Sequence, residues 1–161
     1  MKEQLVGCQA QAEDLAARLE RDLDRIRSAA SSFQEHPRVF FEEWDDPLIS
    51  GIRGVEELVE IAGGTPIFPE LADARLAKDR IVDPADVARR DPQVVFASWC
   101  GKKVNKDRIR SRAGWNHVRA VRDDRIYEIK STYILQPGPA SLTEGVAQIH
   151  AILGRIQHNG Q

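Results

Sequence analysis

The chain has 161 residues, enough for a single domain with a substantial hydrophobic core. Its 23 Lys and Arg residues nearly balance its 25 Asp and Glu residues, so the charge gives no sign of a nucleic-acid or other polyanion partner. No apolar run reaches the roughly 18 residues that cross a bilayer, and Met1 to Gly7 lacks the apolar stretch of a secretory signal. The sequence as written therefore predicts a cytoplasmic chain.

Residues 2 to about 33 carry the strongest helical pattern of the chain. Their apolar side chains recur at steps of three and four, at Leu5, Cys8, Ala12, Leu15, Leu19, Leu23, Ile26, Ala30 and Phe33. At about 1.5 Å per residue the helix would be about 45 Å long, more than the rest of the domain requires. The pattern indicates either a coiled-coil arm or a spine helix packed along two lobes, one of which is absent here. The apolar stripe from Leu5 to Phe33 would then be partly exposed, which predicts self-association.

Strands and helices alternate after His36 and Pro37, which are expected to end that helix. Strands are predicted at 38–43, 94–98 and 126–129, and helices at 54–62, 84–90, 106–112 and 139–156. Gly63 and Gly64 suit a helix C-cap, Asp83 suits an N-cap, residues 65–82 suit an irregular segment, and 118–129 suits a hairpin with its tip at 122–124. The alternation predicts an α/β fold: a three-layer lobe with a largely parallel sheet, preceded by the long amino-terminal spine helix.

Three aromatic residues stand at or just past the ends of predicted strands: Trp44, Trp99 and Tyr133. Ligands of open α/β sheets bind outside the carboxyl ends of the strands, where the loops diverge. Three flat rings at such an edge suit a large, partly apolar, planar ligand better than a small ion. Ordinary core or interface packing is the alternative for each ring.

The cysteines and histidines form no recognisable metal motif, so no metal and no cofactor are predicted. Lys102 and Lys103 would favour the thiolate of Cys100, but no histidine and orienting carboxylate are arranged in sequence around it. The sequence therefore predicts no enzyme, with a thiol enzyme using Cys100 as a remote alternative. The basic segment that follows, with Arg108, Arg110 and Arg112, is interpreted as a solvated helix face.

Several motifs in this order resemble the cobalamin-binding proteins that supply ATP-binding-cassette (ABC) importers. They are the strings at 39–51 (VFFEEWDDPLISG), 60–64 (EIAGG), 91–95 (DPQVV), 98–103 (SWCGKK) and 134–139 (ILQPGP). The resemblance implies two α/β lobes joined by one rigid helix, with the corrinoid between them. Residues 1–35 would be the spine helix and 36–161 the carboxyl-terminal lobe. The ligand-binding residues that it implies are Trp44, Asp45, Asp46, Ser50, Trp99, Cys100, Lys102 and Tyr133.

The same resemblance implies cobalamin as the transported ligand, an importer permease as partner, and a periplasmic location for the full-length family. An iron-siderophore or haem-binding lobe of this class is the alternative. The chain departs from the family in starting within the spine. It also has Ile134-Leu135-Gln136 where an acidic importer-docking residue is expected, so that role is not assigned.

Overall fold

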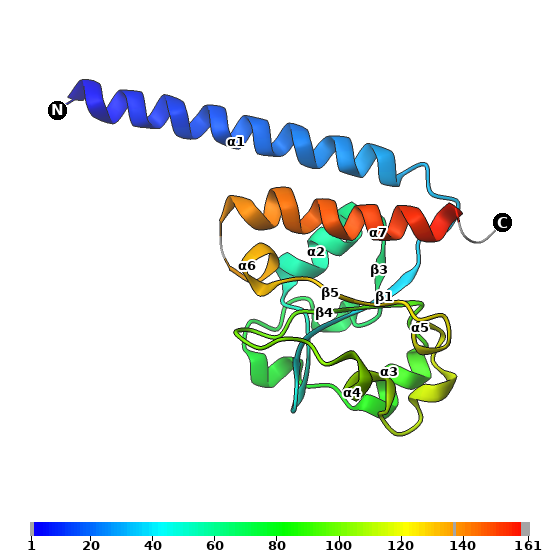
Figure 1. Ribbon diagram of the computed structural model, residues 1–161. Coiled ribbons are helices and arrows are strands. Elements are labelled where there is room, and N and C mark those ends of the chain that lie inside the picture. Colours follow the sequence, from blue (N-terminus) through cyan, green and yellow to red (C-terminus); the bar gives the residue numbers. More distant parts are fainter. Residues whose placement is uncertain (1, 137, 159–161) are drawn as a thin grey trace.

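The computed structural model describes residues 2–136 and 138–158, and a five-stranded mixed sheet lies at its centre (Figure 1). The strands are β1 (Arg38–Asp45), β2 (Leu48–Ser50), β3 (Thr65–Pro66), β4 (Val94–Ala97) and β5 (Ile126–Glu128). Their order is β2-β1-β4-β5, with β3 beside the start of β1. Strands β3, β1, β4 and β5 pair in parallel, whereas β2 is antiparallel to β1. The predicted strands and the largely parallel sheet are confirmed.

Helices cover both faces of this sheet, which confirms the three layers (Figure 1). One face carries α1 (Lys2–Ala30), α2 (Arg53–Ala62) and α7 (Val146–His158), and the other carries α3 (Pro84–Arg90), α4 (Lys106–Arg110) and α5 (Arg119–Arg122). Side chains alternate along each strand, so Val94 and Phe96 pack with α2 and α7 while Val95 packs with α3 to α5. Both faces are buried, which is why β4 is apolar throughout.

Helix α1 packs on the lobe through its carboxyl-terminal half only. Leu23, Ile26 and Phe33 contact the core formed with α2 and α7. The amino-terminal half extends beyond the start of α7, and Val6 and Leu15 are 65% and 47% exposed there (Figure 1). The helix ends at Ala30, before His36, and the hydroxyls of Ser31 and Ser32 satisfy the carbonyls of Ser28 and Ala29 in its last turn.

The predicted helix caps at Gly63 and Asp83 are confirmed. Gly63 follows α2 with a φ of 107°, and a side chain there would place Cβ 2.5 Å from the ring of Phe33. The carboxylate of Asp83 accepts a 2.8 Å hydrogen bond from the backbone N–H of Ala85 at the start of α3.

The predicted hairpin at 118–129 is wrong. Strand β5 pairs with β4 rather than with 118–121; Arg119–Arg122 instead form α5, and Val118 and Ala120 are buried in the core on that face of the sheet. Asp124, with a φ of 52°, lies in the connection between α5 and β5. Short helical turns occupy much of the remaining chain, namely η1 (Pro69–Leu71), η2 (Ala77–Arg80), η3 (Trp115–His117), α6 (Ser131–Ile134) and the π-helical η4 (Ser141–Gly145) before α7.

Candidate ligand site at the carboxyl edge of the sheet

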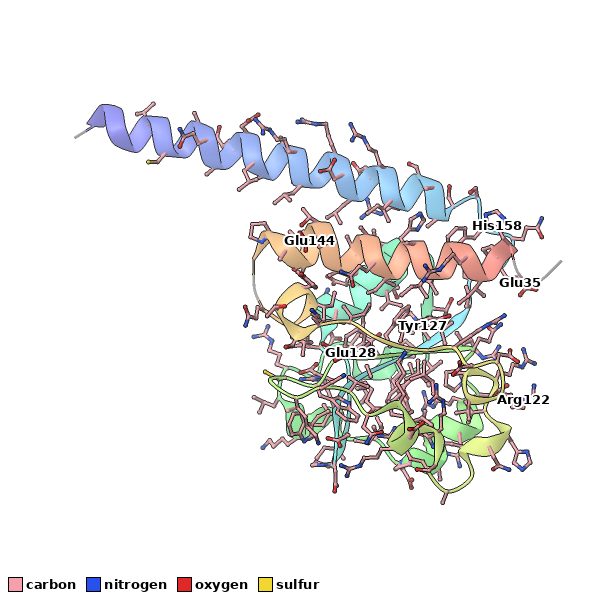
Figure 2. All side chains as sticks on the ribbon, viewed as in Figure 1. Glu35, Arg122, Tyr127, Glu128, Glu144 and His158 are labelled. Atoms are coloured by element: carbon pink, nitrogen blue, oxygen red, sulfur yellow. The ribbon has the colours of Figure 1, made fainter. Side chains whose placement is uncertain are left out.

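The carboxyl ends of β1, β4 and β5 meet at one edge of the sheet because these strands are parallel. In Figure 2, Glu128 at the end of β5 lies to the left of Arg122, which ends α5 before β5 begins. A cavity of about 220 Å³ opens here between the segment after β4 and the segment that joins β5 to α6. It is lined by Trp99, Gly101, Lys102, Lys103, Glu128, Ile129, Lys130, Ser131 and Thr132.

Trp44 and Trp99 flank a single ammonium group. The Nζ of Lys102 lies 5.3 Å from the ring centroid of Trp44 and 4.9 Å from that of Trp99. Trp99 is only 2% exposed, and its indole N–H donates a 3.0 Å hydrogen bond to Glu42. Trp44 is half-buried, and its N–H donates to the carbonyl of Asp46 at 3.0 Å. Trp99 is thus a fixed wall of the cavity, and Trp44 is the more accessible ring.

The two adjacent aspartates have different surroundings. The Asp45 side chain is 1% exposed and lies 3.0 Å from Lys102 Nζ and 2.8 Å from Arg108 Nη1. Asp46 precedes Pro47 through a cis peptide bond, and its side chain is 80% exposed. Asp45 therefore positions Lys102 and Arg108, while Asp46 faces solvent.

The other predicted ligand residues are more scattered. Cys100 is an exposed free thiol beside the cavity-lining Gly101. Ser50 is 1% exposed, and its hydroxyl donates to the Arg80 carbonyl at 3.3 Å. Tyr133 lies on the short helix α6, which follows β5, and is partly buried. The structure therefore gathers Trp44, Asp45, Trp99 and Lys102, whereas the Ser50 hydroxyl is engaged with Arg80.

A buried ion pair behind Trp99 was missed by the sequence analysis. The Glu42 side chain is fully buried, and Arg112 binds both of its oxygens, at 2.7 and 2.8 Å. The Arg112 guanidinium also lies 4.7 Å from the ring centroid of Trp115. A glutamate within an apolar strand was the available signal, because a buried carboxylate needs a charged or hydrogen-bonding partner.

The interpretation of the arginines as a solvated helix face is therefore wrong for two of them. Arg112 follows the end of α4, and its side chain is only 12% exposed. Arg108 binds the buried carboxylate of Asp45. Arg110 pairs with Asp107 and Asp124 and stays at the surface. The partners of Arg108 and Arg112 are buried carboxylates on β1, and the helical pattern of the segment does not reveal them.

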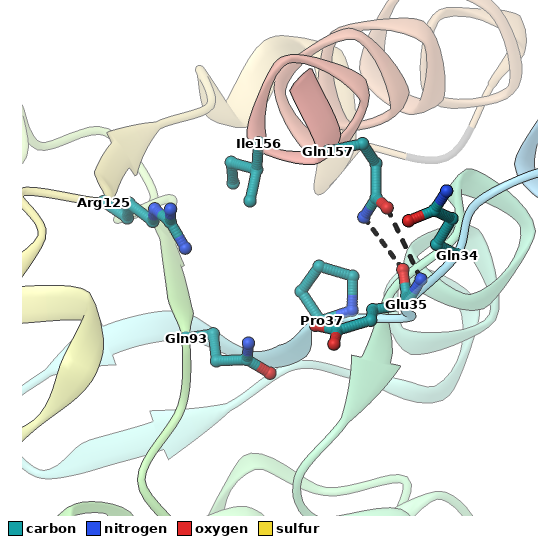
Figure 3. Close-up of a pocket in the computed structure, with 7 residues that line it drawn as sticks. All are labelled: Gln34, Glu35, Pro37, Gln93, Arg125, Ile156 and Gln157. Carbon is teal, nitrogen blue, oxygen red and sulfur yellow. Dashed lines mark hydrogen bonds between the residues drawn. The ribbon is translucent and has the colours of Figure 1, made fainter. Parts of the chain in front are cut away.

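A second cavity, of about 190 Å³, lies at the opposite edge of the sheet (Figure 3). Pro37, Gln93 and Arg125, which precede β1, β4 and β5, line it together with the end of α7. The Gln157 side-chain amide binds the backbone of Glu35 through two hydrogen bonds, and the side-chain amide oxygen of Gln93 accepts from the Arg38 backbone N–H at 3.1 Å. The Gln157 bonds join α7 to the chain that enters β1, and the Gln93 bond joins the start of β1 to the chain that enters β4.

Among residues 2–136 and 138–158, no three His, Cys, Asp or Glu side chains are grouped so that they could hold a metal ion. No helix in this part of the chain combines the length and the apolar character needed to cross a membrane.

The chain belongs to the periplasmic binding protein family, whose sequence model matches residues 4–133. No curated protein sequence matches it significantly. Its fold is that of several solved binding proteins, although their sequences are too distant to show more than the fold.

Three of these structures illustrate the likeness. A possible iron-binding (periplasmic solute-binding) protein from Staphylococcus epidermidis ATCC 12228 is 20% identical, with a TM-score of 0.76 over 93% of this chain and 57% of that protein. A periplasmic haem-binding protein from Roseiflexus sp. RS-1 is 24% identical, with a TM-score of 0.70 over 92% and 59%. The periplasmic vitamin B12-binding protein of Vibrio cholerae is 23% identical, with a TM-score of 0.62 over 86% and 51%. The chain thus spans between half and three fifths of the length of these proteins.

Proposed function

We propose that this chain provides the spine helix, residues 1–35, and the carboxyl-terminal lobe, residues 36–161, of a bilobal solute-binding protein that supplies an ABC importer. The proposed ligand is cobalamin or a related corrinoid, and the proposed location of the complete protein is the periplasm or its equivalent outside the cytoplasmic membrane. The observation that carries this proposal is the open cavity at the carboxyl edge, with two tryptophans and a cation beside it.

The shape of α1 supports a second lobe. Its amino-terminal half extends past α7 on the side of the carboxyl edge, as the positions of α1 and α6 show in Figure 1. Exposed Val6 and Leu15 on that half would be buried by a second lobe packed there. This chain covers only 51–59% of the length of the structures of similar fold, which agrees with a second lobe.

The aromatic residues support a large planar ligand. Trp44 is more accessible than Trp99, whose ring packs against Lys102. Tyr133 lies on α6, the short helix that follows β5. Asp46, Cys100 and Lys102 offer polar atoms at the rim, and peripheral amides of a corrinoid would hydrogen-bond to such groups. Haem or an iron chelate is the second candidate, because proteins of this fold are described as haem- or iron-binding.

Titration calorimetry of the purified chain with cyanocobalamin, haemin and a ferric hydroxamate tests the proposal. We expect cyanocobalamin to bind and Trp44→Ala to weaken binding by about 2 kcal/mol or more, as truncation of an aromatic anchor does. Leu76→Ala removes a side chain that is 56% exposed on the segment beside β2, and should leave binding unchanged. Binding of haemin without cyanocobalamin would replace the proposed ligand, and binding of none of the three would contradict a working site on this lobe.

A further inference from the structure

The cavity at the carboxyl edge carries two lysines, Lys103 and Lys130, that pair with no carboxylate among the described residues. Lys103 comes from the segment after β4, and Lys130 comes from the segment after β5. Within the described residues, neither ammonium group lies within ion-pair distance of a carboxylate, and both residues are exposed. Lys102, in contrast, is already held by Asp45.

The neighbouring groups add hydrogen-bond donors and little negative charge. Ser131 and Thr132 line the same cavity, and no hydrogen bond of either hydroxyl is found among the described residues. Glu128 is the one carboxylate in the lining, and its Oε1 accepts a 3.2 Å hydrogen bond from the Val104 N–H. The lining therefore has an excess of positive charge, with an apolar wall formed by Trp99 and Ile129.

We propose that this cavity binds an anionic oxygen group of the ligand, a carboxylate or a phosphate, through Lys103 and Lys130 with Ser131 and Thr132 as neutral donors. The inference rests on the proposed function for the remainder of the ligand. Two ammonium groups from separate segments suit an anion with several acceptor oxygens, since each lysine presents three donors. A cationic or fully neutral group would leave both lysines unpaired after the ligand has displaced their water.

Inorganic phosphate is the first probe, since it tests the anion site without a macrocycle. In a titration followed by amide NMR spectra, we expect shifts confined to residues 101–104 and 129–132. Lys103→Gln/Lys130→Gln should weaken the response by roughly tenfold or more, because charge-assisted hydrogen bonds are lost. Arg75→Gln/Lys78→Gln is the matched control: it removes the same charge from an exposed segment beside β2, at the other side of the sheet, and should behave like the wild type.

Two ligand pairs then distinguish the source of the anion. Cyanocobalamin carries a phosphate that dicyanocobinamide lacks, and haemin carries carboxylates that its dimethyl ester masks. In one of the two pairs, we expect the compound that carries the anion, cyanocobalamin or haemin, to bind roughly tenfold more tightly than the compound that lacks it. That difference in affinity should be lost in Lys103→Gln/Lys130→Gln.

The outcomes separate this inference from the proposed function. Macrocycle binding that is unaffected by the lysine variant, with a phosphate response that is absent or unchanged by the variant, overturns the anion site and leaves the proposed function standing. A lysine-dependent phosphate response with no macrocycle binding supports the anion site and contradicts the proposed ligand.

Discussion

Removal of the Arg112 guanidinium should be among the most damaging single changes in this lobe. In Arg112→Met, the fully buried Glu42 carboxylate loses both guanidinium hydrogen bonds and, among the described residues, keeps only the 3.0 Å bond from the Trp99 indole. Removing one partner of a buried pair typically costs about 3–5 kcal/mol, because the remaining charge is left uncompensated. Whole domains are stable by only about 5–15 kcal/mol, so the loss is readily measured.

Urea unfolding followed by far-ultraviolet circular dichroism provides the measurement, with near-ultraviolet spectra reporting on the packing of Trp99. The double variant Glu42→Gln/Arg112→Met is the decisive control, because it leaves no buried charge while an amide oxygen can still accept from the indole. We expect the double variant to be more stable than Arg112→Met alone, which is the non-additivity of residues in contact. A loss below about 1 kcal/mol in Arg112→Met would refute the reasoning, since it would mean that the carboxylate is solvated or otherwise paired.

Three further predictions concern other parts of the fold. Burial raises the pKa of the Glu56 carboxyl to about 8, so the unfolded chain loses this proton at lower pH than the folded chain, and stability falls between about pH 4.5 and 8. Glu56→Gln should remove that loss, by on the order of a few kcal/mol at pH 8, and equal unfolding curves for the two proteins across this range would contradict it. Gly63→Ala should destabilise the protein by about 1–3 kcal/mol in urea unfolding, because Gly63 has a φ of 107° and lies against the Phe33 ring. Gly54→Ala is the control: this position in the first turn of α2 has open space around it, so the change should be neutral or slightly stabilising. Equal effects of the two substitutions would argue against the cap. The exposed stripe on α1 should promote self-association that Leu15→Gln weakens, and a wild-type chain that sediments as a strict monomer at high concentration would count against this role of the helix.

The sequence by itself determined the layers, the caps and the edge at which the candidate site lies. All four residues of β4 are apolar, so both faces of this strand must be covered. The helices predicted between the strands supply that cover, and helical connections of this kind join parallel strands. The caps at Gly63 and Asp83 depend on nearby backbone groups, so local sequence is sufficient to predict them.

Only the tertiary structure decided the partners of the charged side chains and the fate of the 118–129 segment. Arg112 meets Glu42 across 70 positions of sequence, and Lys102 meets Asp45 across 57, so no helical or strand period reveals either pair. The alternation of apolar residues at 118–129 is compatible with a hairpin, but in the structure β5 pairs with β4 and Arg119–Arg122 form α5. Local pattern determines which face of an element is buried, whereas the neighbour that buries it depends on how distant segments pack.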